Sequence, residues 1–191
     1  MKTTIIIPNY NGIEYLEKCL ISLQKCEAND FHIIVVDNGS TDGCVELLKE
    51  KFETVETLFL PENIGFAPAI NRGLELVKTS YALLLNNDVT VEPDFVLRME
   101  EAMDTRKNCF SVSAKMLQMH NPELLDGAGD LYCALGWAFA LGKGKTTKDH
   151  YTKPAEIFSS CAGAAIYRMD ILLSKLFRMF CNFLLCPLVR L

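Results

Sequence analysis

Polar residues suited to binding a charged ligand recur at four points of the sequence, each directly after a short apolar run. The first is Pro8-Asn9-Tyr10-Asn11, and the second is the stretch 37–42, which reads Asp-Asn-Gly-Ser-Thr-Asp. The third covers residues 61–65, and the fourth is Asn86-Asn87-Asp88. Amide and carboxylate oxygens bind hydroxyl groups, bases and hard divalent cations. Together the four stretches therefore favour a site for a polar, metal-associated ligand.

The elements that must position these stretches alternate in type along the first half of the chain. Strands are predicted from the short apolar and β-branched runs 3–7, 31–36, 55–60, 81–85 and 109–114. Helices are predicted over 13–26, 42–52, 66–78 and 93–103, the last with Pro93 at an early helical position. This alternation predicts βαβ units and an α/β fold with a mostly parallel sheet flanked by helices on both faces.

A parallel sheet would bring the four polar stretches to one edge, because ligands of such sheets bind beyond the carboxyl ends of the strands. That edge has few cations, so a diphosphate bound there would need a divalent metal, and Asp88 is the candidate ligand for Mg²⁺ or Mn²⁺. Each stretch taken alone is also typical of a turn or a helix cap. The recurrence after four consecutive strands favours a binding site.

The second half of the chain has a weaker pattern. The stretch "HNPELLDGAGD" at 120–130 is predicted to be a loop, and 132–154 cannot be assigned from its mixture of glycine, aromatic residues and lysine. The stretch "FSSCAGAAIYRM" at 158–169 is predicted to be a turn of small residues that enters a strand.

Composition limits the classes of protein that fit. The chain has 191 residues, half of them hydrophobic, which suits one domain. Its net charge of −5 disfavours a nucleic-acid partner. The eight cysteines contain no C-x-x-C pair and no nearby histidine cluster, so free thiols in a reducing compartment are expected. No secretory signal or membrane-spanning run is visible, and a cytoplasmic location is predicted.

Other phosphate-binding patterns are missing from the sequence. It contains no G-x-x-x-x-G-K-[ST] and no G-x-G-x-x-G after the first strand, which removes support for a P-loop enzyme or a nicotinamide dehydrogenase. A nucleotidyltransferase of related topology would need a basic, glycine-rich loop after the first strand. Pro8-Asn9-Tyr10-Asn11 does not supply that loop, so this alternative ranks last.

Four motifs in order resemble the N-terminal half of family 2 glycosyltransferases. These are "TTIIIPNYNGIEYLEKCLISL", "IIVVDNGSTDG", "LPENIGFAPAINRGLE" and "YALLLNNDVTVEPDF", and the resemblance covers roughly residues 3–168. It implies a GT-A type fold, a nucleotide-diphosphate sugar as donor, an acceptor hydroxyl on a glycan or a lipid-linked molecule, and inversion at the anomeric carbon. The variant "LLLNND" and the stretch "DGAGD" are most similar to the rhamnosyltransferase-like branch.

The resemblance also implies roles for individual residues. Those matching donor-binding positions of the family are Pro8, Tyr10, Asn11, Asp37, Ser40, Asn63, Gly65, Asn71, Asn86, Asn87 and Asp88. Asp37 would recognise the base, and Asp88 would bind the metal that bridges the diphosphate. Asn86 stands where the family has the first aspartate of its Asp-x-Asp motif. The segment from Cys161 to Arg168 is similar to the part that supports the acceptor side.

The general base of the family is not found at its expected place. In the family it lies in an acidic motif soon after the segment that Arg168 ends, but residues 171–191 here contain no acidic residue. Asp126, Asp130, His120 and His150 are substitute candidates. We therefore expect a partial nucleotide-sugar-binding domain at 1–170 and an atypical apolar, basic tail at 171–191, which is either a truncated ending or a contact with the inner face of a membrane. The alternative to a transferase is a truncated, inactive nucleotide-sugar-binding protein.

Overall fold

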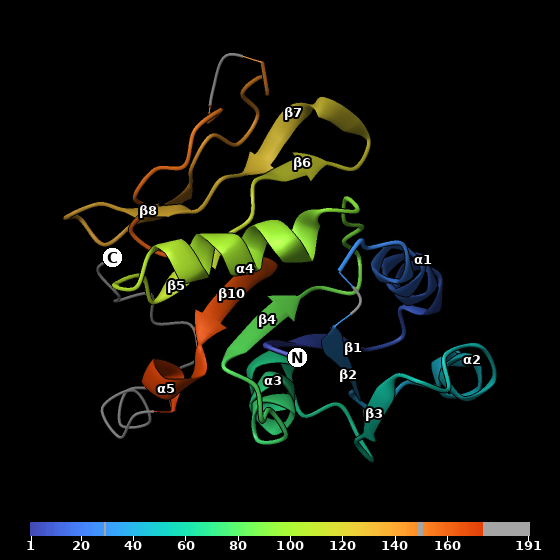
Figure 1. Ribbon diagram of the computed structural model, residues 1–191. Coiled ribbons are helices and arrows are strands. Elements are labelled where there is room, and N and C mark those ends of the chain that lie inside the picture. Colours follow the sequence, from blue (N-terminus) through green and yellow to red (C-terminus); the bar gives the residue numbers. More distant parts are fainter. Residues whose placement is uncertain (29, 149–150, 174–191) are drawn as a thin grey trace.

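The computed structural model describes residues 1–28, 30–148 and 151–173, and these form an α/β fold around a central six-stranded sheet (Figure 1). The strands and helices follow one another as β1 (Thr3–Asn9), α1 (Ile13–Gln24), β2 (Phe31–Asp37), α2 (Cys44–Lys51), β3 (Glu56–Phe59), α3 (Phe66–Leu74), β4 (Tyr81–Leu85), α4 (Phe95–Thr105), β5 (Ser111–Ser113), β6 (Met116–Gln118), β7 (Asn121–Gly127), β8 (Asp130–Tyr132), β9 (Ala138–Ala140), β10 (Ala164–Arg168) and α5 (Met169–Leu172).

The sheet has the order β3-β2-β1-β4-β10-β5. β1 pairs in parallel with β2 and β4, and β2 pairs in parallel with β3. β10 lies antiparallel between β4 and β5, so β5 again runs in the direction of β4. The predicted mostly parallel sheet is confirmed, and the carboxyl ends of β1 to β4 share one edge.

Both faces of the sheet are buried, which explains why its strands are continuous apolar runs. Successive strand residues point to opposite faces. Ile5 and Ile7 therefore pack in a core with residues of α1, α2 and α4, whereas Ile6 packs in a second core with residues of α3 and α5. None of the helices within the described ranges is long and apolar enough to cross a bilayer.

Two predictions about local structure were wrong. Pro93 is not a helical residue: it precedes the N-cap Asp94, and its carbonyl accepts a hydrogen bond of 2.8 Å from the Glu27 N–H. The stretch 120–130 is mostly strand, because β7 pairs with β6 across a bulged antiparallel ladder. The predicted turn into a strand at 158–169 is confirmed by β10. Residues 174–191, which hold most of the predicted tail, lie outside the described residues, as does His150.

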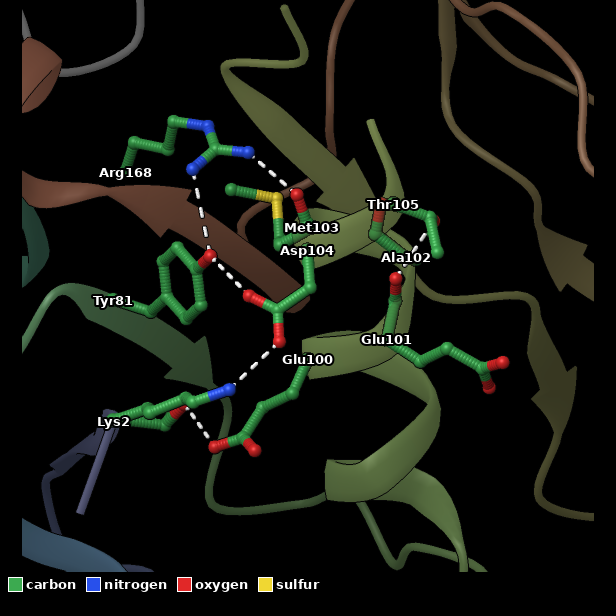
Figure 2. A network of polar contacts seen from close by, with 10 residues as sticks. Lys2, Tyr81, Glu100, Glu101, Ala102, Met103, Asp104, Thr105 and Arg168 are labelled. Atoms are coloured by element: carbon green, nitrogen blue, oxygen red, sulfur yellow. Dashed lines mark hydrogen bonds and ion pairs between the residues drawn. The ribbon is translucent and has the colours of Figure 1, made fainter. Parts of the chain in front are cut away.

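A polar network fastens β4, β10 and α4 together at the edge opposite the strand ends of the candidate site (Figure 2). The Arg168 guanidinium donates to the carbonyls of Met103, Arg106 and Cys109, the last at 2.7 Å. It also lies over the ring of Tyr81, 5.5 Å from the ring centroid. The last carbonyls of a helix lack partners within the helix. Arg168 therefore supplies hydrogen-bond donors to carbonyls at the C-terminal end of α4.

Asp104 continues this network toward the amino terminus (Figure 2). It accepts hydrogen bonds from the Tyr81 hydroxyl at 2.7 Å and from the Lys2 ammonium at 2.8 Å. The Lys2 hydrogen bond and then the Tyr81 hydrogen bond lower the pKa of Asp104 below its ordinary value.

This lowered pKa predicts a pH-dependent contribution to stability. A carboxyl whose folded-state pKa is depressed stabilises the fold above its unfolded pKa and loses that effect as the pH falls through the folded value. We expect Asp104→Asn to lower the free energy of unfolding at neutral pH by a small amount, because the pair is half exposed. The difference from the parent should shrink between about pH 5 and about pH 3 in urea titrations. If the difference in the free energy of unfolding between parent and Asp104→Asn stayed constant over this range, Asp104 would not be the source of the pH dependence. The same conclusion would follow if Glu101→Gln gave an equal, equally pH-dependent difference.

Candidate active site

The four polar stretches predicted from the sequence meet at one edge of the sheet, as expected. In the parallel register Asn9, the last residue of β1, is aligned with Asp37, the last residue of β2, which in turn is aligned with Phe59 near the end of β3. β4 lies on the other side of β1 and ends at Leu85, directly before Asn86-Asn87-Asp88.

Asn9 joins the ends of β1, β2 and β4, and it is almost fully buried, at 2% exposure. Its amide nitrogen donates to Asp37 Oδ1 at 3.0 Å, Ser40 Oγ at 3.3 Å and Cys44 Sγ at 3.1 Å. Its amide oxygen accepts from Asn87 Nδ2 at 2.7 Å. The sequence prediction did not include Asn9 among the binding residues. The available signal was an amide at the final position of the strand, directly after the apolar run Ile5-Ile6-Ile7 and Pro8.

The loops after β1 and β2 are fastened to each other. The Asn11 N–H donates to Ser40 Oγ at 2.9 Å, and the Thr41 N–H donates to Asn11 Oδ1 at 2.8 Å. Asn11 has a φ of 49°, a left-handed conformation that asparagine tolerates better than most residues. The Ser40 N–H also donates to Asp37 Oδ2 at 3.1 Å. Asn11, Asp37 and Ser40 are therefore brought together as predicted.

Asp42 acts at two helix ends. Its carboxylate accepts from the Ile13 N–H at the start of α1, at 2.9 Å, and from the Cys44 N–H at the start of α2, at 3.2 Å. Partial burial favours the neutral form of Asp42, but hydrogen bonds from the Cys44 thiol and from these N–H groups outweigh it and lower the pKa. Burial, followed by the hydrogen bond to Asp42, raises the pKa of the Cys44 thiol to about 11. Asp42 is therefore a charged cap that fixes the two loops.

The loop after β3 is held by Asn38. The Asn38 amide donates to Asn63 Oδ1 at 2.9 Å and to the Gly65 carbonyl at 3.2 Å, and it accepts from the Ile64 N–H at 3.0 Å. Gly39 packs against the backbone of this loop, because an added Cβ there would lie 2.7 Å from the Glu62 carbonyl carbon. The third polar stretch is therefore fixed beside the second.

The end of β4 presents the candidate metal ligand. The Asn86 N–H donates to the Gly163 carbonyl at 2.9 Å. Asn86 Oδ1 is buried and has no hydrogen-bond partner among the described residues, which is unusual for an amide oxygen. Asp88 is exposed at the rim. Burial, followed by the charge of Asp88, raises the pKa of the Cys19 thiol to about 12. Cys19 is therefore a neutral, buried thiol within reach of the charge of Asp88.

These donors suit a hard divalent cation. Within the described ranges no three His, Cys, Asp or Glu side chains gather at one point, so a metal held wholly by such residues does not fit there. The exposed carboxylate of Asp88 fits Mg²⁺ or Mn²⁺ when the remaining ligands come from phosphate and water. The donor set is compatible with the predicted metal, provided that the phosphate belongs to the substrate.

The other predicted residues occupy different positions. Pro8 is buried within β1, and Tyr10 is half exposed directly after it. Asn71 lies in α3, which packs on β1 and β2, and no side-chain hydrogen bond in the described part of the chain joins it to the rest of the site. Asp126 lies in β7, 3.6 Å from Lys143, and burial raises the pKa of Asp130 at the start of β8.

A groove of about 1080 Å³ lies away from these strand ends. It follows β5, which is separated from β4 by β10, and it is lined by the C-terminal end of α4 and by residues 151–157. The candidate site is therefore identified by its side chains and not by this groove.

Gly12 offers a test of the strand-end network. A Cβ at this position would lie 2.3 Å from Asn87 Nδ2 and 3.1 Å from Asn9 Oδ1, so the two amides can meet only because residue 12 has no side chain. We expect Gly12→Ala to separate Asn87 from Asn9 and to lower the free energy of unfolding by about 1–3 kcal/mol. Gly127→Ala is the control, because its nearest neighbour would be Ala140 at 4.0 Å. Equal losses of stability in urea unfolding would contradict the role of Gly12.

Comparison with known proteins agrees with this geometry. The model of the family described as glycosyl transferase family 2 matches residues 4–173. The chain belongs to glycosyl transferase family 2. The resemblance drawn from the four motifs is thereby confirmed at the level of the family.

Curated relatives include proteins whose names refer to teichoic acid and to teichuronic acid. The chain is 38% identical over 91 residues to a teichoic acid poly(glycerol phosphate) polymerase of Staphylococcus epidermidis, covering 46% of this chain and 13% of that protein. It is 31% identical over 126 residues to TuaG of Bacillus subtilis, a putative teichuronic acid biosynthesis glycosyltransferase, covering 64% of this chain and 50% of that protein. The chain thus spans half or less of the length of both relatives.

Solved structures share the fold of this chain. A fragment of S. aureus TarS aligns with a TM-score of 0.64 at 21% identity, over 90% of this chain and 48% of that one. A mannosyltransferase of Pyrobaculum calidifontis, solved with GDP-Man and Mn²⁺, aligns with a TM-score of 0.61 at 16% identity, over 90% of this chain and 45% of that one. The predicted GT-A type fold is confirmed.

Proposed function

We propose that this chain binds a nucleotide-diphosphate sugar at the carboxyl ends of β1 to β4 and transfers the sugar to an acceptor hydroxyl with inversion. The observation that carries the proposal is the convergence of the polar strand ends on Asn9, with the Asp88 carboxylate at the rim. Membership of family 2 and the relatives named for teichoic and teichuronic acid synthesis support it.

The strand-end residues divide into those that would meet the nucleoside and those that would meet the diphosphate. Asp37 and Ser40 would hold the loop that faces the base, and the Asn63–Gly65 loop would close over the nucleoside. Asp88 would hold Mg²⁺ or Mn²⁺, with the Asn86 and Asn87 amides beside it. When bound, the metal would stabilise the negative charge that develops on the departing diphosphate.

The acceptor is proposed to be a glycan or a lipid-linked hydroxyl used in building a cell-surface polymer, with the reaction at the inner face of the membrane. A base must remove the proton of the acceptor hydroxyl. Asp126 and Asp130 are the described carboxylates that we propose for this step. The rhamnosyltransferase-like motifs favour a deoxysugar donor, and we propose that the donor-binding unit corresponds to residues 1–170.

A second candidate function is binding of the nucleotide sugar without transfer. It is favoured by the absence of any acidic residue in the sequence 171–191, where the family resemblance leads us to expect the base. The two functions differ in whether sugar reaches an acceptor, and not in donor binding.

Calorimetric titration of the whole chain with UDP-, GDP- and dTDP-sugars tests the shared part of both functions. We expect one nucleotide class to bind in the presence of Mn²⁺ or Mg²⁺ and to bind much more weakly after chelation. The absence of metal-dependent binding across the panel would refute the donor site. A second assay would then measure sugar transfer to an acceptor together with release of the nucleotide diphosphate. Transfer would support the glycosyltransferase, and binding without transfer would support the inactive binding protein.

A further inference from the structure

The groove beside β5 is a second place on the molecule where a ligand fits, and the proposed donor site does not use it. Its volume of about 1080 Å³ is as large as that of pockets that hold drug-sized ligands. It is lined by the C-terminal end of α4, by β5 and by the stretch 151–157. We call this space the β5 groove.

Most charged side chains that line the β5 groove are positive. Four cations line it, against the single carboxylate of Glu156, and they are Arg106, Lys107, Lys115 and Lys153. All four are exposed, and within the described ranges none of them forms an ion pair. Lys115 donates to a neutral group, the Thr147 carbonyl, at 3.5 Å. The chain as a whole has a net charge of −5, so the β5 groove is a local concentration of unpaired positive charge.

The last acidic residues of α4 do not neutralise this charge. Asp104 accepts hydrogen bonds from Lys2 and Tyr81, and Glu101 pairs with an arginine of its own helix at 3.5 Å. The stretch 105–122 then contains three of the four cations and no acidic residue. An anionic ligand in the β5 groove would therefore meet these cations without competition from the carboxylates of α4.

The edge of the sheet adds backbone donors to the β5 groove. β5 is an end strand of the sheet, paired with β10 on one side and with no described strand on the other. Residues of an antiparallel strand alternate in directing their N–H and C=O groups toward the partner and away from it. The Ala114 N–H donates to the Ala164 carbonyl of β10 at 2.9 Å. Ser111 and Ser113, which line the β5 groove, therefore direct their N–H groups to its side of the strand.

We propose that the β5 groove binds a linear polymer whose repeating units carry phosphodiester groups. Phosphate oxygens accept hydrogen bonds from Arg and Lys side chains and from backbone N–H groups, and the β5 groove offers all three. Its cations lie before β5 at Lys107, after β5 at Lys115 and on the stretch 151–157 at Lys153. A chain with regularly spaced charges can contact several of them at once, whereas a single phosphate cannot.

Two other anionic partners fit the β5 groove less well. An acidic peptide added to β5 as a strand would need its carbonyls, but the Ser111 carbonyl already accepts from the Cys109 thiol at 2.9 Å. A nucleic acid would need aromatic rings on which its bases stack. Among the described lining residues Tyr151 is the aromatic one, and Lys145 lies over its ring, 6.0 Å from the centroid.

Under the proposed transferase function this polymer is the acceptor, and that role rests on the proposed function. Binding of the polymer does not, because β10 separates β5 from β4 and the donor residues follow β1 to β4. The two ideas can therefore fail separately. A chain that binds the polymer but no nucleotide sugar would refute the donor site alone.

Titration of the whole chain with a labelled glycerol-phosphate oligomer tests the proposal, without nucleotide sugar or metal. Inorganic phosphate is titrated in parallel as the free form of the same chemistry. We expect the oligomer to bind at least about tenfold more tightly than inorganic phosphate, because several cations act on one chain. Its affinity should fall as the salt concentration is raised from about 50 to about 200 mM, because salt screens and displaces such contacts.

Variants locate the contact. Lys107→Gln combined with Lys153→Gln should weaken binding of the oligomer about tenfold. Lys18→Gln combined with Lys25→Gln is the matched control, because it removes the same charge from exposed lysines at α1, and it should bind like the parent. Glu156→Gln should strengthen binding about twofold, since it removes the one carboxylate of the β5 groove. A gain of affinity cannot result from misfolding.

Four outcomes would overturn the proposal. The oligomer could bind no more tightly than inorganic phosphate, or the α1 control could lose as much affinity as the variant of the β5 groove. An oligothymidylate of equal charge could bind more tightly than the oligomer, which would indicate a nucleic-acid site. Poly-glutamate of equal charge could do so instead, which would indicate a site for an acidic peptide.

Discussion

Replacing Asp88 by asparagine should remove metal-dependent binding of the nucleotide sugar. Asparagine keeps the size of the side chain and loses the charge, so the change tests the metal and not the packing. Removing a group that only supports a metal ligand weakens metal affinity by about 10–100-fold. Removing the carboxylate that binds the metal should therefore weaken the affinity by at least about 100-fold. Calorimetric titration with Mn²⁺ present measures the effect.

The control for Asp88 is another exposed carboxylate close in the sequence. Asp94 is the N-cap residue of α4 and pairs with Arg98 at 3.0 Å, and no hydrogen bond of its side chain in the described residues reaches the strand ends, so Asp94→Asn should leave donor binding unchanged. If Asp88→Asn bound the sugar nucleotide in the presence of Mn²⁺ as well as Asp94→Asn does, Asp88 would not be the metal ligand. Both variants should melt close to the parent, because both side chains are solvent-accessible.

Replacing Arg168 by methionine should have the largest effect on stability. Methionine retains an unbranched side chain but removes the donors to the Met103, Arg106 and Cys109 carbonyls. Each partly buried carbonyl left unsatisfied is costly, and the ring of Tyr81 loses its cation. We expect the free energy of unfolding to fall by about 3 kcal/mol, measured by urea titration.

Arg98 provides the comparison on the same helix. It forms surface ion pairs with Asp94 and Glu101, and such pairs contribute little, so Arg98→Met should change stability by less than about 1 kcal/mol. Arg168→Lys should recover only part of the loss, because an ammonium cannot reproduce the planar fork of donors. If Arg168→Met and Arg98→Met lowered the free energy of unfolding by similar small amounts, the hydrogen bonds of Arg168 would not stabilise the fold. Since Arg168 is aligned with Tyr81 at the start of β4, folded Arg168→Met should still bind donor.

Local pattern in the sequence was sufficient for the first half of the fold. The run Ile5-Ile6-Ile7 is apolar on both sides because helices cover both faces of the sheet. Such runs, followed by polar residues and then by helical spacing, predict parallel strands whose carboxyl ends meet. Asp37, Ser40, Asn63 and Asp88 were located at that edge for this reason.

Contacts between distant segments could not be predicted in the same way. β10 lies between β4 and β5 although more than 40 residues separate it from either along the chain, and the small buried side chains of Ala164 and Ala165 give no local sign of that partner. The strand at 121–127 was missed because β7 is stabilised by pairing with β6 and not by its own composition, which includes Asn121 and Pro122.

The sequence by itself therefore determined the kind of fold, the edge at which the ligand residues gather and the family to which they belong. Only the tertiary structure decided how those residues are held. Asn9 joins the loops after β1, β2 and β4 through one buried amide. Gly12 leaves room for Asn87 to reach that amide. Arg168 binds backbone carbonyls at the opposite edge of the sheet. These roles arise from distances between segments far apart in the chain, and local periodicity carries no information about such distances.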